Sequence, residues 1–243
     1  MKGSIDSVSV ALIRESDAKT IAGGVPGLTL MYRAALGVFL SANWEGKTVI
    51  AVGSGNNGGD GFALACILRE RGHACRVVTL SDSRSADGAH FAARAEALGV
   101  EIVPYVPGAL LGCDTVVDCL LGTGFQGRVR ETYARAIEEI NASGAFVLSV
   151  DINSGMNGDT GEAETAVRSD LTVTIGFVKT GLVAPRAGAY MKRLVWADLG
   201  IGLCRREKTI RTDGKVPRAQ DELPCPPWLD PEPIDVRDVP YAP

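Results

Sequence analysis

Six short β-branched stretches, separated by helical patterns, constrain the fold of this chain more than any other feature. The stretches are TVIAV (48–52), CRVVTL (75–80), TVVDCL (115–120), FVLSVDI (146–152), LTVTI (171–175) and LVWADLGI (194–201). Between several of them, apolar residues recur at helical spacing, most clearly in residues 61–72. Strands that alternate with helices are typical of parallel βαβ units. We therefore predict an α/β protein, a three-layer αβα sandwich with a Rossmann-like, doubly wound and mostly parallel sheet.

Length and proline content suggest one domain with an extension. A chain of 243 residues, 46% of them hydrophobic, can bury one sizeable core. Of the 12 prolines, eight follow residue 204, where apolar residues are sparse. Such a segment cannot bury enough apolar surface to fold alone. We expect a domain at residues 1–204 and a proline-rich tail at 205–243 that is disordered or draped over the domain and dispensable for chemistry.

Charge and cysteine content exclude several classes of function. The 25 basic and 29 acidic residues leave a net charge of −4, and no long basic run suggests binding to nucleic acid. The six cysteines have no metal-ligand spacing, so we expect reduced thiols. No apolar stretch approaches the length of a membrane span. We expect a cytoplasmic protein that binds neither nucleic acid nor membrane, while a small anionic ligand remains open.

The loops that follow the predicted strands are the candidate sites, because open parallel sheets bind ligands beyond the carboxyl ends of their strands. They are GSGNNGGDG (53–61), DCLLGTGFQGRVR (118–130), DINSGMNGDTGE (151–162) and GFVKTGL (176–182). The first contains a G-x-G-x-x-G pattern, which taken alone favours a dinucleotide-binding turn. However, Asp60 stands at the expected helix start, where a carboxylate would repel a pyrophosphate. A tight turn with Asp60 as helix cap is the structural alternative.

Oxygen-bearing side chains converge at the same edge of the predicted sheet. Asp118 and Asp151 stand at strand ends, Ser154 follows closely, and Asn57 lies in the first loop. Hard cations take such oxygen ligands. Each of these residues alone would most often be a turn residue. Four at one edge indicate a polar site.

The loop GTGFQG (122–127) predicts an anion site. Its glycines free backbone N–H groups, a helix is expected to begin near residue 129, and Arg128 and Arg130 follow directly. A solvated glycine-rich turn with surface arginines is the alternative. The two histidines, His73 and His90, lie on predicted helix flanks away from these loops and do not suggest a general base.

Together, the four loop stretches resemble, in order and spacing, the signature stretches of the NAD(P)H-hydrate epimerases. The stretch DAKTIAGGVPGLTLMYRAA (17–35) resembles the lead-in helices of that family, so the similarity covers residues 9–204. Members interconvert the R and S epimers of hydrated NADH and NADPH and work alongside a dehydratase. This chain has Asn153 where the family usually has proline, Tyr32 in place of an acidic residue, and Ala35 in place of glycine.

The resemblance implies specific roles for residues of this chain. It implies that the hydrated dinucleotide contacts Asn56, Asn57, Gly58, Gly59 and Asp60. It implies that the phosphates lie on Gly122, Thr123, Gly124, Phe125, Gln126, Gly127 and Arg128. It further implies that Asp151 touches the substrate and that Asn57, Asp118 and Ser154 bind a potassium ion. Asp151 is our candidate for general acid–base catalysis.

The resemblance also implies the partners and leaves one rival function. The substrate would be hydrated NADH or NADPH, a separate NAD(P)H-hydrate dehydratase would use the product, and a homodimer is a further expectation. The alternative is a non-catalytic nucleotide- or protein-binding module on the same fold. An NAD-dependent dehydrogenase would need a second substrate domain, for which 243 residues leave no room.

Overall fold

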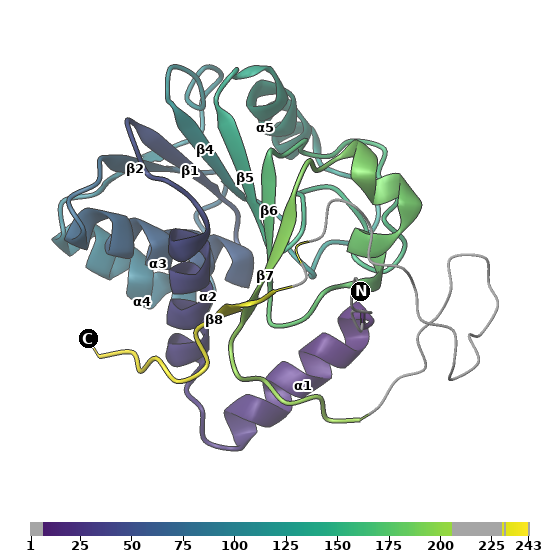
Figure 1. The fold of residues 1–243 in the computed structure, drawn as a ribbon. Helices are drawn as coiled ribbons and strands as arrows, with labels where there is room; N and C mark the ends of the chain where they lie inside the picture. Colours follow the sequence, from purple (N-terminus) through teal and green to yellow (C-terminus); the bar gives the residue numbers. More distant parts are fainter. Residues whose placement is uncertain (1–6, 206–229, 231, 243) are drawn as a thin grey trace.

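The computed structural model describes residues 7–205, 230 and 232–242 (Figure 1). Its strands form one parallel sheet in the order β3-β2-β1-β4-β5-β6-β7-β8. The strands are β1 (Thr48–Val52), β2 (Cys75–Thr79), β3 (Glu101–Pro104), β4 (Thr115–Cys119), β5 (Phe146–Val150), β6 (Leu171–Ile175), β7 (Leu194–Asp198) and β8 (Ile234–Asp235). The chain runs outward from β1 to β3 and returns to β4 on the other side of β1. This confirms the doubly wound sheet and places its switch point between β1 and β4.

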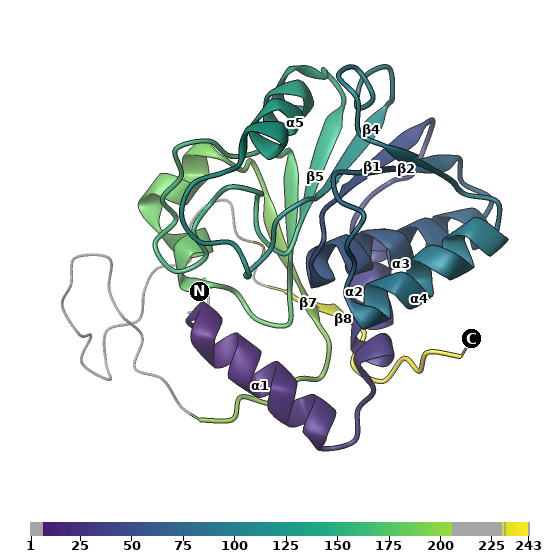
Figure 2. The ribbon, with the colours of Figure 1, turned by 180° about the vertical axis from the view of Figure 1, so that it is seen from behind.

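Helices cover both faces of the sheet. On one face lie α2 (Gly27–Ser41), α3 (Asn56–Glu70) and α4 (Ala86–Ala97), and on the other lies α5 (Glu131–Ala142), as Figures 1 and 2 show from opposite sides. The side chains of strand β1 point alternately to the two faces of the sheet. Ile50 and Val52 join the core under α2 and α3, while Val49 and Ala51 join the core under α5. Because both faces are covered, the strand is a continuous apolar run and not an alternating one.

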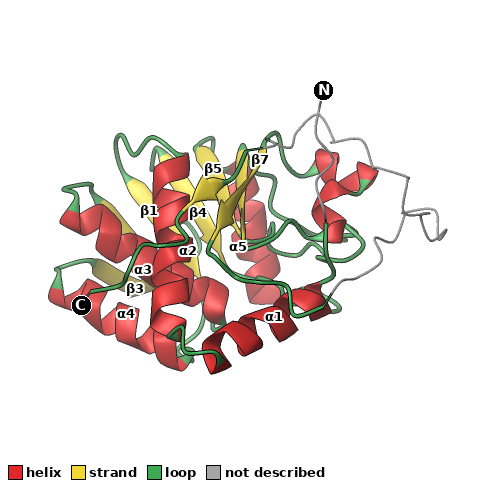
Figure 3. Ribbon diagram, turned by 60° about the horizontal axis from the view of Figure 1, so that its bottom comes forward, coloured by secondary structure: helices red, strands yellow, loops and turns green. Residues whose placement is uncertain are grey.

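Helix α1 (Val10–Ala22) belongs to neither layer, because it crosses below the carboxyl ends of the strands (Figure 3). Its first amide, Val10 N, donates to Asp159 Oδ1 at 2.7 Å. The guanidinium of Arg14 donates to the Thr123 carbonyl at 2.7 Å. Before the helix, Val8 pairs with Lys179 as an isolated β-bridge. These contacts hold α1 against the loops that follow β4, β5 and β6.

The structure changes the predicted elements at several ends. The strands at 48–52 and 171–175 have the predicted bounds, and the other predicted strands end one to three residues earlier. Strand β3 was not predicted, because it is a four-residue edge strand that ends in proline. Helix α3 begins at Asn56, not at residue 61, so NNGGDG forms its first turns and not a loop. The short 3₁₀ helices η1 (Thr180–Val183) and η2 (Pro185–Ala189) follow β6.

The end of the tail packs on the domain. Strand β8 extends the sheet beside β7, and Val236 is only 1% exposed. The ring of Tyr241 lies 5.2 Å from that of Tyr32 and 5.1 Å from that of Phe91. Residues 206–229 lie outside the described part of the chain, so the boundary after residue 204 and the dispensability of the tail stay predictions. No helix in the described part is long and apolar enough to cross a membrane.

Candidate functional site

A cavity of about 720 Å³ lies at the switch point of the sheet, between α1 and the ends of β1, β4 and β5. Most of the predicted site residues line it: Asn56, Asn57, Asp60, Gly122, Thr123, Gly124, Phe125, Gln126, Arg128 and Asp151. Gly58, Gly59 and Gly127 do not line it, and neither do Asp118 and Ser154, which lie behind the loop after β4. Four further charged residues line the cavity although the sequence did not single them out as ligands: Arg14, Asp17, Asp87 and Lys179.

The first glycine-rich stretch is shaped by packing within the protein. A Cβ atom on Gly58 would lie 2.1 Å from the Gly53 carbonyl oxygen, and one on Gly59 would lie 2.5 Å from Met31 Cε. Both glycines therefore allow α3 to pack against its neighbours, and at these two positions the close approach is to protein atoms. The N-cap of α3 is Gly55. The capping alternative for Asp60 is therefore wrong, because Asp60 is the fifth residue of the helix.

Asn57 is buried and lacks hydrogen-bond partners within the described part of the chain. Its residue is 6% exposed, and neither Oδ1 nor Nδ2 is bonded. Gly122 brings it close to Asp151, since a Cβ atom on Gly122 would lie 3.0 Å from Asn57 Cβ and 3.2 Å from Asp151 Oδ2. An unpaired buried amide costs free energy, which a polar ligand or an ion would recover.

Asp118 and Ser154 form a buried pair directly behind this point, and neither is exposed to solvent. Ser154 donates to the carboxylate through both its backbone N–H, at 2.9 Å, and its hydroxyl. Ser149 Oγ donates to Asp118 at 2.9 Å, and Leu121 N donates to Ser154 Oγ at 2.8 Å. Burial raises the pKa of Asp118, and the hydrogen bonds from Ser154 oppose that rise. The pair ties the ends of β4 and β5 together.

Asp151 is held in one orientation by a buried cation. Lys179 is fully buried and pairs with Asp151 Oδ1, while it also donates to Thr174 Oγ1 at 3.0 Å and to the Ile175 carbonyl at 2.7 Å. Asp151 Oδ2 accepts a hydrogen bond from Thr123 N at 3.3 Å. Among the described non-glycine residues, only Asp151 has a positive φ, of 70°. Lys179 was missed, although it stands in the predicted strand-end loop GFVKTGL.

Two further carboxyl groups enter the cavity from helices. Asp60 projects from α3, and burial raises its pKa well above the usual value, with an added contribution from the charge of Asp151. Asp17 projects from α1, and burial raises its pKa to about 6, although the charge of Lys179 opposes the rise. Sequence reasoning missed Asp17 as a site residue, although it opens the stretch DAKTIAGGVPGLTLMYRAA, because that stretch was interpreted only as lead-in helices.

The anion-binding features predicted after β4 lie along the cavity. Arg14, Arg128 and Arg130 all contribute to its lining, and Arg14 holds the Thr123 carbonyl. Helix α5 begins at Glu131, and the side chain of its N-cap residue, Arg130, makes no capping hydrogen bond. Free N–H groups at a helix start attract anions. The arrangement can therefore hold phosphate groups beside the carboxylate cluster.

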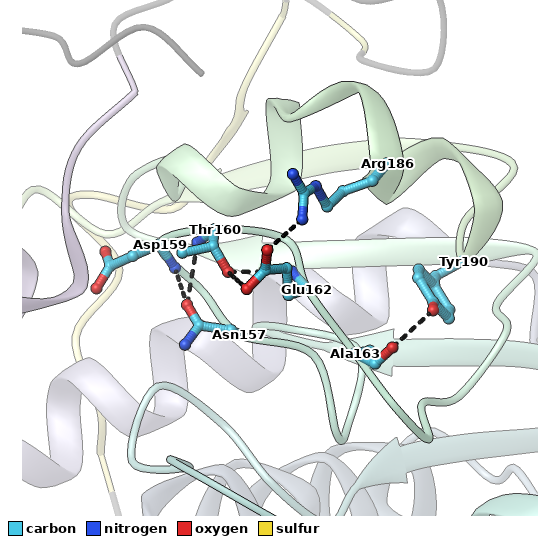
Figure 4. A network of polar contacts seen from close by, with 7 residues as sticks. All are labelled: Asn157, Asp159, Thr160, Glu162, Ala163, Arg186 and Tyr190. Carbon is cyan, nitrogen blue, oxygen red and sulfur yellow. Dashed lines mark hydrogen bonds and ion pairs between the residues drawn. The ribbon is translucent and has the colours of Figure 1, made fainter. Parts of the chain in front are cut away.

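The second half of the loop after β5 has a structural role (Figure 4). Asn157 Oδ1 accepts hydrogen bonds from Asp159 N at 2.9 Å and Thr160 N at 3.0 Å. Glu162 forms an ion pair with Arg186 of η2, and Tyr190 Oη donates to the Ala163 carbonyl at 3.2 Å. Because Asp159 also accepts from Val10 N, this part of the loop anchors the start of α1.

Asn153 replaces the proline that the resemblance leads one to expect. It is fully buried, and the two hydrogens of its Nδ2 are shared among three acceptors at 2.9–3.0 Å, the Val167 carbonyl, Ser169 Oγ and the Tyr190 carbonyl. Its Oδ1 accepts from Thr172 Oγ1 at 2.7 Å. These side-chain bonds fix the loop by a different means from the rigid ring of proline.

Comparison with known proteins agrees with these features. The family described as "YjeF-related protein N-terminus" matches residues 27–181. An NAD(P)H-hydrate epimerase of Limosilactobacillus fermentum is 37% identical over 203 residues, which cover 79% of this chain and 96% of that protein. An NAD(P)H-hydrate epimerase of Rhodopirellula baltica is 36% identical, over 74% of this chain and 78% of the relative.

Longer relatives and a solved structure complete the comparison. The bifunctional NAD(P)H-hydrate repair enzyme Nnr of Coxiella burnetii is 37% identical over 78% of this chain but only 40% of its own length. The crystal structure of yeast ynu0 (YNL200c) superposes with a TM-score of 0.68, covering 91% of this chain and 98% of the yeast chain, at 18% sequence identity. That likeness confirms the fold. Since the family match spans more than half of the chain and the relatives exceed 30% identity, this chain belongs to the YjeF-related family, to which the signature loops pointed.

Proposed function

We propose that this protein is an NAD(P)H-hydrate epimerase, which interconverts the R and S forms of hydrated NADH or NADPH. The names of its relatives support this function. The observation that carries it in this chain is Asp151, held by buried Lys179 in a cavity beside an anion-binding loop. A carboxylate fixed next to a dinucleotide-sized cavity suits proton transfer on a bound nucleotide.

The chemistry follows from the reacting carbon of the substrate. That carbon bears a hydroxyl group and the ring nitrogen, so the nitrogen lone pair can expel the oxygen and leave an iminium-like cation. Water that returns to the other face inverts the centre. Asp151 would exchange a proton with the oxygen, and Lys179 and Thr123 N would keep its carboxylate in place. Ring opening to an aldehyde followed by closure is an alternative route to the same product.

The cavity walls suggest how the dinucleotide would be oriented. The residues from Gly122 to Arg128 and the start of α5 would hold its phosphates, with Arg14 fixing the loop from the side of α1. Asn56, Asn57 and Asp60 at the start of α3 would contact the rest of the substrate. Gly58 and Gly59 would support the helix and not the ligand.

We also propose a potassium ion, held by Asn57, Asp118 and Ser154. The donor set suits a hard cation, because it consists of an amide, a carboxylate and a hydroxyl group. The unbonded Oδ1 of buried Asn57 supports the assignment, and so does the buried charge of Asp118, which a cation would stabilise. When bound, the ion would supply positive charge beneath the phosphate-binding loop.

The remaining expectations concern the setting of the reaction. The Coxiella relative is named a bifunctional repair enzyme, and this chain matches 40% of it. We expect a separate NAD(P)H-hydrate dehydratase to use the product. A cytoplasmic location agrees with the described cysteines, Cys66, Cys75, Cys113, Cys119 and Cys204, which are all free. The homodimer stays a prediction.

The test supplies purified protein with a mixture of the two epimers and an S-specific dehydratase. If the proposal is right, the R form is consumed at a rate that rises with the amount of protein and lies well above the rate measured without the protein. An R form that persists at the enzyme-free rate would contradict epimerisation. Saturable binding of the hydrates without turnover would then indicate the non-catalytic module.

A further inference from the structure

Inversion at the reacting carbon by water exchange requires proton transfer on both faces of the ring, which Asp151 alone does not provide. In the water-exchange route, the oxygen leaves one face of the ring and water adds to the other. Asp151 is fixed at Oδ1 by Lys179 and at Oδ2 by Thr123 N, and it projects from the sheet side of the cavity. A carboxylate held at both oxygens cannot swing around the ring. A second proton-transfer group elsewhere on the cavity wall would meet this demand.

Asp17 approaches the cavity from a different direction. It lies in the middle of α1, the helix that crosses below the strand ends, whereas Asp151 follows β5 (Figure 3). Its Oδ1 is buried and has no hydrogen-bond partner within the described part of the chain. A half-buried carboxyl group with one unbonded buried oxygen is free to exchange a proton with a ligand in the cavity.

The other ionisable groups of the cavity are less suited to this task. Lys179 already donates to three acceptors. Asp87 lies against the start of α2, since a Cβ atom on Gly27 would be 2.3 Å from its Oδ2. Asp60 lies on α3 at the β1 side of the cavity, and the sequence resemblance assigns it to dinucleotide binding. Arginine remains charged at all relevant pH values and does not exchange protons.

We infer that Asp17 is a second catalytic residue, which exchanges a proton with the substrate oxygen on the face that Asp151 does not reach. The inference rests on the proposed epimerase function. In one direction, the Asp17 carboxyl group protonates the departing hydroxyl, the C–O bond breaks, water is released and the nitrogen lone pair forms the C=N bond. A new water molecule then forms a C–O bond on the opposite face and gives its proton to Asp151. In the reverse direction the two aspartates exchange roles, and solvent returns the proton between turnovers.

Asp17 can hold its proton under mild conditions because of its surroundings. Burial raises its pKa to about 6, the charge of Asp151 adds to the rise, and the charge of Lys179 opposes it. Asp60 on α3, Asp87 on α4 and Arg14 on α1 also line the cavity and contribute to the local field. A group that must donate in one direction and accept in the other works best near its own pKa.

The test compares Asp17→Asn with Glu15→Gln, a control on the same helix whose carboxylate faces outward and pairs with Arg205. We first establish that the wild-type protein consumes the R epimer in the coupled assay. Asp17→Asn should then lower kcat by about 10²- to 10⁴-fold, with KM changed only a few-fold. The wild-type activity should change around pH 6, where Asp17 titrates, and the residual activity of Asp17→Asn should lose that dependence. Glu15→Gln should match the wild type.

A second variant separates catalysis from folding. Asp17→Ala should regain activity when formate is added, because a small carboxylic acid can occupy the space left by the side chain, whereas a structural role would give no rescue. Asp17→Asn with kcat within threefold of the wild type, or Asp17→Ala that formate does not rescue, would overturn the inference while the epimerase function stands. If the wild type itself is inactive, the proposed function fails first.

Discussion

Asp151 shows how one residue can meet two demands at once. Its carboxylate pairs with fully buried Lys179, and its backbone adopts a φ of 70°. Asparagine and aspartate tolerate this left-handed conformation better than other non-glycine residues. Substitution by asparagine therefore removes the charge but tolerates the positive φ. Substitution by another non-glycine residue also disfavours the backbone conformation.

We predict that Asp151→Asn lowers epimerisation by about 10²- to 10⁴-fold, because the amide cannot exchange the proton. The variant should also lose stability, by about 3–5 kcal/mol, because Lys179 remains buried without its counter-ion. Denaturant unfolding measures this loss, and the double variant Asp151→Asn/Lys179→Met should recover part of it. Asp151→Ala should be still less stable than Asp151→Asn because of the positive φ. Wild-type turnover by Asp151→Asn would show that Asp151 only binds or supports the loop.

Asp17 gives a prediction about stability against pH. Its pKa of about 6 in the folded protein exceeds the usual value of 3.8, so ionisation favours the unfolded chain. Between pH 4 and pH 6 this residue removes stability as the pH rises, by at most about 3 kcal/mol. Asp17→Asn should therefore be more stable than the wild type at pH 7, and the difference should shrink toward pH 4. A stability difference between Asp17→Asn and the wild type that stays constant from pH 4 to pH 7 would argue against the raised pKa.

At the scale of elements, the site depends on three segments that meet at one point. Asn57 comes from α3, Asp118 from β4 and Ser154 from the loop after β5, and Gly122 approaches Asn57 closely. A cation bound there would link the three segments in the folded state alone, and such binding stabilises by mass action.

We predict that potassium raises the melting temperature more than sodium or a bulky organic cation at equal ionic strength. At a concentration 100 times the Kd, the gain would be about 2.7 kcal/mol, or about 5–10 °C for a chain of this size. Asn57→Ala should abolish the difference between the cations, whereas Asn141→Ala, on α5, should keep it. Equal melting curves for the wild type in all three salts would exclude the site.

The elements also show what the sequence could and could not predict. The buried strands β1 and β6 were predicted with the correct first and last residues, because continuous β-branched runs are distinctive. The start of α3 was missed, since glycines have low helix propensity and their reason here is tertiary: Gly59 packs against Met31 and Gly88. The pairing of Lys179 with Asp151 was not predicted. The two residues are 28 positions apart in the sequence, and only the order of the strands in the sheet brings them together.

At the scale of the whole molecule, the described end of the tail covers part of the outer edge of β7. Strand β8 pairs with β7, and Arg33 of α2 donates to the carbonyls of Val239 and Leu199 at 2.8 and 2.9 Å. Tyr32, which departs from the expected family pattern, contacts Tyr241. Because Leu199 lines the cavity, the described end of the tail supports one wall of the site, and none of its described residues lines the cavity.

We predict that truncation after Cys204 lowers stability and leaves the chemistry intact. The truncation exposes the β7 edge and removes Val236, whose burial alone contributes about 1.5–3 kcal/mol. The melting temperature should fall by at least about 5 °C, while kcat, measured well below the new melting temperature, should stay within threefold of the wild type. Tyr241→Ala in the full chain is the matched partial change and should lower the melting temperature by a smaller amount. If the truncated protein is folded but inactive, the tail shapes the cavity wall through Arg33 and Leu199, and the expectation that it is dispensable is wrong.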